Sequence, residues 1–411
     1  MRLASIWRWI LGVEDTVIEE VVPDGDRLVV KVRPKRRAKW RCGRCLRRCR
    51  TYDRGDRRRR WRALDLGYVP VYLEAESPRV RCPTHGVVVA SVPWARHNVR
   101  FTRAFEDSVA WLATECSKTA VENLMRISWP TVGRIISRIV ADAGDPAERL
   151  KGLRRIGIDE ISYRKGQRYI TVVINHDTGA LIWAAPGANK EVLNSFFDLL
   201  GESGIETIKL VSADAASWIQ RVVEVRCPRA KICMDPFHVV QWATKALDEV
   251  RRGYWHAART WSQGYHARNY RGARWALLKN PEDLTGNQRI VLAGLQKTNK
   301  ELYRAYLLKE QLRAVFHAPR CRAVELLDAW LVWARRCRIE EFVKVARTIT
   351  EQRDNIVAAL EHGLSNGRVE AANTRIRLIT RRAYGFHSPQ ALISLAMLSL
   401  GGLCPSLPGR S

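Results

Sequence analysis

Apolar and polar residues alternate with a period of two through much of the first hundred residues, which predicts β-strands there. Two alternating runs, residues 15–22 and 28–32, flank a turn formed by residues 23–26. A turn rich in Pro, Asp and Gly between such runs predicts a β-hairpin. From residue 101 onward the apolar spacing lengthens to three and four residues, so helices are predicted to replace the strands.

Three helices are predicted between residues 101 and 145. They begin after Thr102, Ser117 and Ser128, because a serine or threonine before an apolar periodic run is suited to capping a helix. The tight turn between the last two helices fits a helix-turn-helix, whose last helix would enter the major groove of DNA. An ordinary three-helix linker domain is the alternative interpretation.

A second β-rich region begins near residue 155 and organises the rest of the chain. Its first strand, residues 155–158, leads to Asp159 and is predicted to deliver this acid to the edge of a sheet. The following elements are predicted as a strand over 169–174, a strand over 181–185, a helix over 190–200, a strand over 207–211, a helix over 216–225 and a strand over 230–234. This order is that of a ribonuclease H-like fold, in which the first and fourth strands are neighbours in a mixed sheet.

Asp159 and Asp214 follow the first and fourth of these strands, so this topology would bring them together. Two carboxylates that leave positions open for phosphate oxygens and water suit a hard divalent cation such as magnesium. Asp235, which follows the fifth strand, is a further candidate ligand. A solvated acid at a strand end is the alternative interpretation.

Residues 240–360 interrupt this fold with a segment of helical pattern that is rich in basic and aromatic residues. Such helices can contact the DNA backbone and its bases, although most of their tryptophans are better explained as packing between helices. A helix that starts near Ser365 then places Glu370, Asn373 and Arg377 on one face. Glu370 would supply the third carboxylate of a two-metal site. A last apolar helix is predicted to pack against the sheet.

The composition indicates a polyanionic partner. The 411 residues carry a net charge of +28, and 46% of them are hydrophobic, which describes a globular chain long enough for several domains. So much positive charge repels itself in a compact state, and nucleic acid is the first candidate to neutralise it. No run reaches the roughly 18–20 apolar residues of a spanning helix, and the first residues lack the apolar core of a signal peptide. We therefore expect no membrane segment.

Ten cysteines without an export signal suggest reduced thiols and a metal site. Cys42 and Cys45 form a Cys-x-x-Cys knuckle, and Cys82 and His85 form a Cys-x-x-His knuckle after a gap of 36 residues. Four such ligands can close tetrahedrally around zinc, so we predict a structural, ribbon-like zinc site. Cys49 is an alternative ligand, and a coincidental group of reduced cysteines is the competing interpretation.

Basic residues are densest around these knuckles. Between Lys31 and Arg62, 17 residues are Lys or Arg, and only Asp53 and Asp56 are acidic. This imbalance favours contact with phosphates over a role in solubility alone. The candidate DNA-binding residues are Arg57, Arg58, Arg59, Arg60, Arg134, Arg138, Arg377 and Arg381.

With these motifs the chain resembles the bacterial insertion-sequence transposases of the ISL3 family, over nearly its full length. The resemblance rests on the two cysteine knuckles and on residues 156–160, 234–240, 247–252, 365–373 and 381–386. One departure is Pro236, where many relatives are expected to carry an arginine; it affects a local phosphate contact and not the fold.

The resemblance implies an acidic triad of the Asp-Asp-Glu type, carried here onto Asp159, Asp214 and Glu370. It implies magnesium or manganese ions at this triad, which activate water or a DNA 3′-hydroxyl and stabilise the leaving oxygen without a covalent protein intermediate. The expected function is that of a transposase that binds terminal inverted repeats, cleaves DNA and transfers strands to target DNA. It is expected to act as a homodimer or larger assembly on DNA, in the bacterial cytoplasm and associated with the nucleoid.

Two other functions remain open. One is a DNA-binding regulator, derived from a transposase, that no longer cuts. The other is a ribonuclease H-like nuclease, which shares the metal chemistry but cleaves hybrid or branched substrates without joining strands.

The expected fold class is α/β, with a ribonuclease H-like mixed sheet that contains a helical insertion. A zinc-ribbon-like β domain and a helix-turn-helix domain are expected before it. The expected domains are residues 1–100 for the β and zinc-binding domain, 101–145 for the helix-turn-helix domain, 151–240 with 361–405 for the catalytic domain, and 241–360 for the helical insertion.

Overall fold

A computed structural model describes residues 3–55, 58–214, 216–260 and 270–409. Arg57, one of the predicted DNA-binding residues, lies outside these ranges. The chain divides into two compact units, one formed by residues 1–144 with 378–411 and the other by residues 145–377. The four predicted domains follow other boundaries and stay a prediction.

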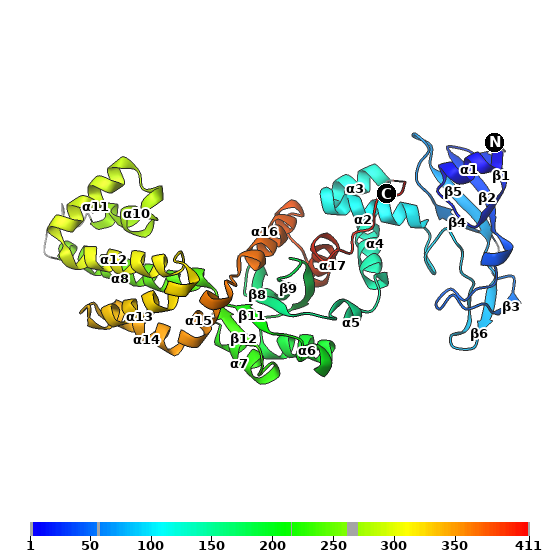
Figure 1. Ribbon diagram of the computed structural model, residues 1–411. Coiled ribbons are helices and arrows are strands. Elements are labelled where there is room, and N and C mark those ends of the chain that lie inside the picture. The colour runs from blue at the N-terminus through cyan, green and yellow to red at the C-terminus, as the bar shows by residue number, and fades with distance from the viewer. Residues whose placement is uncertain (1–2, 56–57, 215, 261–269, 410–411) are drawn as a thin grey trace. The chain divides into compact units, whose positions relative to one another are not determined.

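The N-terminal part of the first unit is a β-sheet built on the predicted hairpin (Figure 1). Its strands lie in the order β1-β2-β5-β4 and span Thr16–Asp24 (β1), Arg27–Pro34 (β2), Val71–Glu76 (β5) and Arg58–Arg62 (β4). Alternate side chains of β5 are buried because successive residues of a strand point to opposite faces, whereas both Val29 and Val30 of β2 are buried. Trp61 and Trp94 meet edge to face in this core. A short helix that was not predicted, α1 (Leu3–Ile10), precedes the hairpin.

A smaller sheet of the same unit carries the cysteine knuckles. Its strands lie in the order β3-β6-β7, after a short 3₁₀ turn, and the bounds are Arg36–Ala38 (η1), Arg50–Asp53 (β3), Arg79–Cys82 (β6) and Gly86–Val89 (β7). The first knuckle lies in the loop between η1 and β3, and the second spans the turn between β6 and β7. The sheet thus brings together two loops that are far apart in the sequence.

Three helices follow, with bounds Arg103–Glu115 (α2), Lys118–Met125 (α3) and Trp129–Asp142 (α4). Thr102 and Ser117 cap the first two as predicted, since their hydroxyls accept the N–H groups of the residues three positions later. Arg126 adopts a left-handed conformation with φ of 52°, which ends α3 and makes the tight turn before α4.

The last helix, α17 (Pro389–Leu400), packs against α4 and α2 within the first unit. These two helices are partners other than the catalytic sheet that the sequence predicted. The apolar residues of α17 surround the whole helix, so the sequence shows that it is buried but not against what. Among the described residues, no helix is both long and apolar enough to cross a membrane.

The second unit is built on the predicted five-stranded mixed sheet. Its elements before the insertion span Pro146–Arg149 (α5), Arg155–Arg164 (β8), Arg168–Asn175 (β9), Leu181–Pro186 (β10), Lys190–Ile205 (α6), Leu210–Ala213 (β11), Ser217–Arg226 (α7) and Lys231–Met234 (β12). The strand order is β10-β9-β8-β11-β12, with β8 antiparallel to β9 and parallel to β11. The predicted ribonuclease H-like neighbourhood of the first and fourth strands is thus confirmed.

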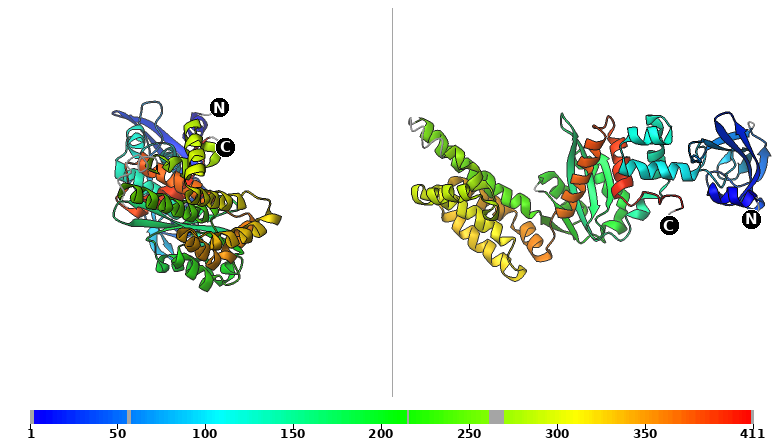
Figure 2. Two further views of the ribbon diagram at one scale, coloured as in Figure 1. Left: turned by 90° about the vertical axis from the view of Figure 1, so that its left-hand side faces the viewer. Right: turned by 90° about the horizontal axis from the view of Figure 1, so that it is seen from above.

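The two faces of this sheet bury different partners. Ile156 and Ile158 of β8 belong to a core formed with α6 and α7. Gly157 lies between them and therefore faces the opposite side of the sheet. This second face receives helix α16 (Gly367–Arg382), which Figure 2 shows in orange across the green strands.

The insertion between β12 and α16 is helical, as predicted. Its elements span Pro236–Thr260 (α8), Arg274–Leu278 (α10), Pro281–Asp283 (η2), Gly286–Thr298 (α11), Lys300–Val315 (α12), Arg320–Arg336 (α13), Glu340–Glu351 (α14) and Arg353–His362 (α15). These helices have their own apolar core, in which Trp330 is 2% exposed. Lys309 is equally buried and donates to the backbone carbonyls of Leu277 and Lys279, so its charge has polar partners.

Val369 of α16 lies against Gly157 of β8. A Cβ atom at this position would lie 2.3 Å from Cγ2 of Val369, 2.7 Å from Nε2 of His176 and 3.0 Å from Oγ of Ser212. We therefore expect Gly157→Ala to lower the stability of this unit by about 1–3 kcal/mol, as overpacking does. Thermal melting of the full-length chain measures the effect.

Gly253→Ala is the matched control, because Gly253 lies within α8 and has open space where its Cβ would be. Alanine is the better helix former, so this control should melt at the wild-type temperature or slightly above it. Equal melting temperatures for both variants would show that α16 moves aside without cost.

Candidate metal sites and nucleic-acid interface

Asp159 lies inside strand β8 and not at its end as predicted, because β8 continues to Arg164 in its pairing with β9. The parallel pairing with β11 nevertheless stops at Ile158, which is opposite Ala213. Asp159 and Asp214 are the next residues on the two strands, so the structure brings this predicted pair together at the carboxyl end of β11.

Asp214 and Asp235 are joined by a histidine that was not predicted as a site residue. Nδ1 of His238 lies 2.9 Å from Oδ1 of Asp214 and 3.1 Å from Oδ2 of Asp235. Hydrogen bonds to Asp214 and then to Asp235 raise the pKa of His238 to about 10, so the imidazole is protonated between two carboxylates. The signal in the sequence was a histidine three residues after an acid at a helix start, a spacing that places both on one side.

Glu370 comes from the first turn of α16 and is exposed. Burial and the negative charges of Asp235 and Asp214 raise the pKa of Glu370, which places its carboxylate in the same electrostatic environment as the strand-end acids. Burial, and then the charge of Asp214, likewise raises the pKa of Asp159 to about 6. These acids repel one another in the absence of a compensating cation.

A buried polar chain lies beneath the acids. Nε2 of His176 lies 2.6 Å from Oγ of Ser212, and this hydroxyl lies 2.5 Å from Oδ1 of Asn366. The backbone N–H of Asn366 donates to Oδ1 of Asp235 at 3.2 Å. Its side-chain Nδ2 lies 3.5 Å from Oδ1 of Asp214. Burial, and then the charge of Arg368, lowers the pKa of His176 to about 4, so its ring is neutral.

The donor set of this cluster fits a divalent cation. Asp214 and Asp235 each offer a carboxylate oxygen, and these oxygens and Nδ1 of His238 lie within 4.8 Å of one another. Asp159 and Glu370 are not members of this group, but the charge of Asp214 acts on both of them. Oxygen ligands with incomplete protein coordination are typical of magnesium and manganese sites that also bind phosphate. Such a cation would favour the ionised acids, whose mutual repulsion opposes their ionisation.

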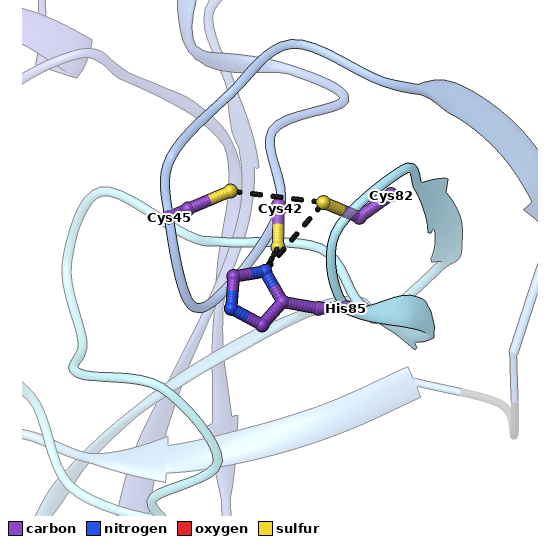
Figure 3. Close-up of side chains that lie close together, drawn as sticks. All are labelled: Cys42, Cys45, Cys82 and His85. Carbon is purple, nitrogen blue, oxygen red and sulfur yellow. Dashed lines mark hydrogen bonds between the residues drawn. The ribbon is translucent and has the colours of Figure 1, made fainter.

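The four predicted zinc ligands also converge (Figure 3). Nδ1 of His85 lies 3.7 Å from Sγ of Cys42 and 3.6 Å from Sγ of Cys82, and Sγ of Cys45 lies 3.7 Å from Sγ of Cys82. A tetrahedron with zinc–sulfur bonds of about 2.3 Å has ligand separations of about 3.8 Å, so the spacing fits a zinc ion. Although burial opposes it, hydrogen bonding with His85 lowers the pKa of Cys82 to about 6, which favours the thiolate that zinc requires.

Cys49, the alternative ligand, is not a member of this four-residue cluster. Its thiol lies 3.3 Å from the backbone carbonyl oxygen of Arg47. The two-knuckle arrangement of Cys42, Cys45, Cys82 and His85 is therefore the one that the geometry supports.

A basic groove of about 820 Å³ lies in the first unit. Among the residues that the structure describes, its lining contains seven arginines and no acid; the arginines are Arg58, Arg59, Arg60, Arg62, Arg79, Arg100 and Arg126. Acids outside the groove pair with five of these arginines, namely Arg58, Arg60, Arg62, Arg79 and Arg126. Burial, and then the charge of Arg100, lowers the pKa of Arg59, which shows that like charges are crowded here.

The remaining predicted DNA-binding arginines differ in their surroundings. Arg134, Arg377 and Arg381 are exposed. Arg138 instead pairs with Glu106, which is fully buried and also pairs with Arg96. This ion pair gives Arg138 a structural partner between α2 and α4, which the sequence did not reveal because a buried acid is rare in a helix.

Three family models match consecutive parts of the chain. The model described as a transposase matches residues 156–396, more than half of the chain. The helix-turn-helix domain of transposase family ISL3 matches residues 90–140, and the zinc-finger of transposase IS204/IS1001/IS1096/IS1165 matches residues 38–85. The predicted zinc-ribbon, helix-turn-helix and ribonuclease H-like parts are confirmed, and they indicate zinc and a divalent cation as cofactors.

Full-length relatives agree with these matches. The chain is 53% identical over 436 residues to the transposase for insertion sequence element IS1557 of two Mycobacterium tuberculosis strains, CDC 1551 and H37Rv, covering 100% of this chain and 98% of the relative. It is 27% identical over 354 residues to the transposase for insertion sequence element IS1001 of Bordetella parapertussis, covering 85% and 86%. The chain therefore belongs to the ISL3 family of insertion-sequence transposases, enzymes of the Asp-Asp-Glu type that cut nucleic acid.

Proposed function

We propose that this transposase binds the terminal inverted repeats of its element, cleaves DNA there and transfers the freed strands to target DNA with magnesium or manganese. The observation that supports this most is that Asp159 and Asp214 follow paired positions of two neighbouring strands. The charge of Asp214 also acts on Asp159 and on Glu370 of α16, more than 150 residues later. When bound, two divalent cations would activate the attacking hydroxyl and stabilise the leaving oxygen of an in-line displacement.

Asp159, Asp214 and Glu370 are proposed as the metal ligands. Asp235 is 3% exposed and bonded to both His238 and Asn366, so we assign it to holding these neighbours; it remains the alternative second ligand. His238 neutralises part of the charge of the two acids that it joins. No protein nucleophile is required in this scheme.

The basic groove is proposed as a contact surface for the DNA backbone. The seven arginines of the groove outnumber the five acids that pair with them in the described part of the chain, and phosphates are the ligands that the remaining positive charge attracts. Arg134 of α4 would add a contact at the helix-turn-helix, and Arg377 and Arg381 would contact phosphates along α16. Two element ends must be joined, so we propose at least a dimer on DNA, in association with the nucleoid.

Zinc is proposed to be structural, held by Cys42, Cys45, Cys82 and His85. A four-ligand tetrahedral site is closed, so it leaves no position for a substrate. Its contribution would be to hold the two knuckle loops of the small sheet together.

Substitution of the acids tests the reaction. Asp159→Asn, Asp214→Asn and Glu370→Gln should each reduce cleavage of a labelled terminal-repeat duplex by more than about a hundredfold, the upper range for losing even an outer-shell partner of a metal. Binding of the same duplex should persist, because the arginine groove is unchanged. Asp177→Asn, at a half-exposed turn, is the control that should cleave normally.

Three outcomes separate the alternatives. Binding without cleavage by the wild-type protein, in magnesium or manganese, would support the inactive regulator. Cleavage of hybrid or branched substrates without strand joining would support a nuclease. Equal loss of binding and cleavage in the acid variants would contradict the assignment of the triad.

Substitution of the groove tests the DNA contact. The double variant Arg59→Ala/Arg100→Ala should weaken binding of the repeats and make the dependence of log K on log salt concentration shallower by about 1.8, because each phosphate contact contributes about 0.9. Arg221→Ala/Arg229→Ala removes two exposed charges from the other unit and is the control. A slope equal to that of the control would remove the groove from the DNA interface.

Substitution of a knuckle tests the zinc site. Purified protein should contain about one zinc ion per chain, and Cys82→Ser should lose it together with stability of the first unit. Cys321→Ser, at an exposed cysteine in α13, should keep the metal. Atomic absorption of the three proteins gives the result, and equal zinc contents would exclude the assigned ligands.

A further inference from the structure

Asn373 contacts the reaction site although nothing in the proposed mechanism uses it. It lies three residues after Glu370 on α16 and is only 3% exposed. Its Nδ2 donates a hydrogen bond to Oδ2 of Asp159 at 2.5 Å, across 214 residues of sequence. A buried amide bonded to a carboxylate of the site is either part of the packing or a support for that carboxylate.

The spacing of helix and strand explains how this contact arises. Val369 lies over Gly157, and Asn373 lies over Asp159. Four residues of an α-helix advance by about 6.0 Å, and two residues of a strand advance by about 6.6 Å. The two elements therefore stay in register over this distance, and the packing contact at Gly157 determines which helix residue reaches Asp159.

The carboxylate of Asp159 is held at both oxygens. Oδ1 accepts the backbone N–H of Glu160 at 2.7 Å, and Oδ2 accepts the amide of Asn373. The orientation of that amide follows from chemistry, because the reverse orientation would set a carbonyl oxygen against an ionised carboxylate. Rotation of the Asp159 carboxylate would break one of these bonds, so its remaining lone pairs keep a fixed direction.

The other end of the same amide has no partner in the described part of the chain. Oδ1 of Asn373 is buried and accepts no hydrogen bond there. A buried acceptor without a donor is costly and rare in native proteins. An apolar residue of similar size would fill the same space but could not donate the bond to Asp159.

We propose that Asn373 is a positioning residue of the transposase reaction, which holds the Asp159 carboxylate in the orientation that binds a divalent cation. This inference rests on the proposed function, in which Asp159 is a metal ligand. Glu370 and Asn373 then act as a pair on one face of α16, one as a ligand and the other as the support of a ligand on the neighbouring strand.

Manganese binding by the full-length protein tests the inference without DNA or turnover. Asn373→Leu keeps most of the volume and removes the donor, and Asn373→Ala removes the donor with less risk of overpacking. Both should raise the dissociation constant for Mn²⁺, measured from the free-ion signal in electron paramagnetic resonance, by roughly 10- to 100-fold, the effect of losing an outer-shell partner. Cleavage should fall in parallel and recover partly at high Mn²⁺ concentration.

Thr374→Ala is the matched control, because Thr374 is the next residue of α16 and is exposed. It should bind Mn²⁺ like the wild type. The melting temperature without metal, measured for all variants, separates support of a ligand from support of the fold.

Two results would overturn the inference. One is wild-type Mn²⁺ affinity in a folded Asn373→Leu or Asn373→Ala protein. The other is failure of both variants to fold, which would assign Asn373 to packing. Asp159→Asn distinguishes these from failure of the proposed function: if that variant binds Mn²⁺ as tightly as the wild type, Asp159 is not a ligand and the metal site itself is wrong.

Discussion

Helix α16 contacts strand β8 at van der Waals distance because residue 157 has no side chain. Val369 occupies the space that a Cβ atom would need, and His176 and Ser212 surround the same point. This contact sets the position of α16 along β8, and with it the positions of Glu370 and Asn373 beside Asp159. The reaction site is thus assembled because the missing Cβ atom at Gly157 leaves room for α16. The acidic residues repel one another and would not hold α16 in place by themselves.

The acidic cluster around His238 and the arginine groove each hold several charges of the same sign close together. Four acids gather around His238, whose single positive charge does not balance them. Seven arginines gather in the groove, and the acids that hold some of them lie outside it. In both places the fold holds like charges together at the expense of stability, and a ligand of the opposite charge relieves the repulsion. Divalent cations and DNA phosphates are such ligands, so binding and folding stabilise each other at both surfaces.

The sequence predicted those features that follow from local patterns. The order of apolar runs and helical segments predicted that the strands before Asp159 and Asp214 are neighbours in the sheet. The spacing of the two knuckles predicted the four residues that converge as zinc ligands. It did not predict features that depend on a partner distant in the chain. The role of Gly157 requires knowledge of Val369, the ion pair of Arg138 requires Glu106, and the docking of α17 on α4 and α2 has no periodic signal because that helix is apolar on all sides. His238 lies in the motif of residues 234–240, but its role depends on the folded structure, in which it bonds to both Asp214 and Asp235.

The helical insertion separates Asp235 from Asn366 by 131 residues, yet the backbone N–H of Asn366 bonds to Asp235. The chain therefore leaves the sheet and returns to it at nearly the same point. Closing a loop of this length costs about 4 kcal/mol of chain entropy, and this cost grows only slowly with length. The insertion offsets it with its own core, while α15 packs on β12 through Ala358 and Ala359. Because α8 also starts directly after Asp235 and carries His238 in its first turn, both ends of the insertion are anchored at the acids. A large insertion at this position thus reinforces the site that it interrupts.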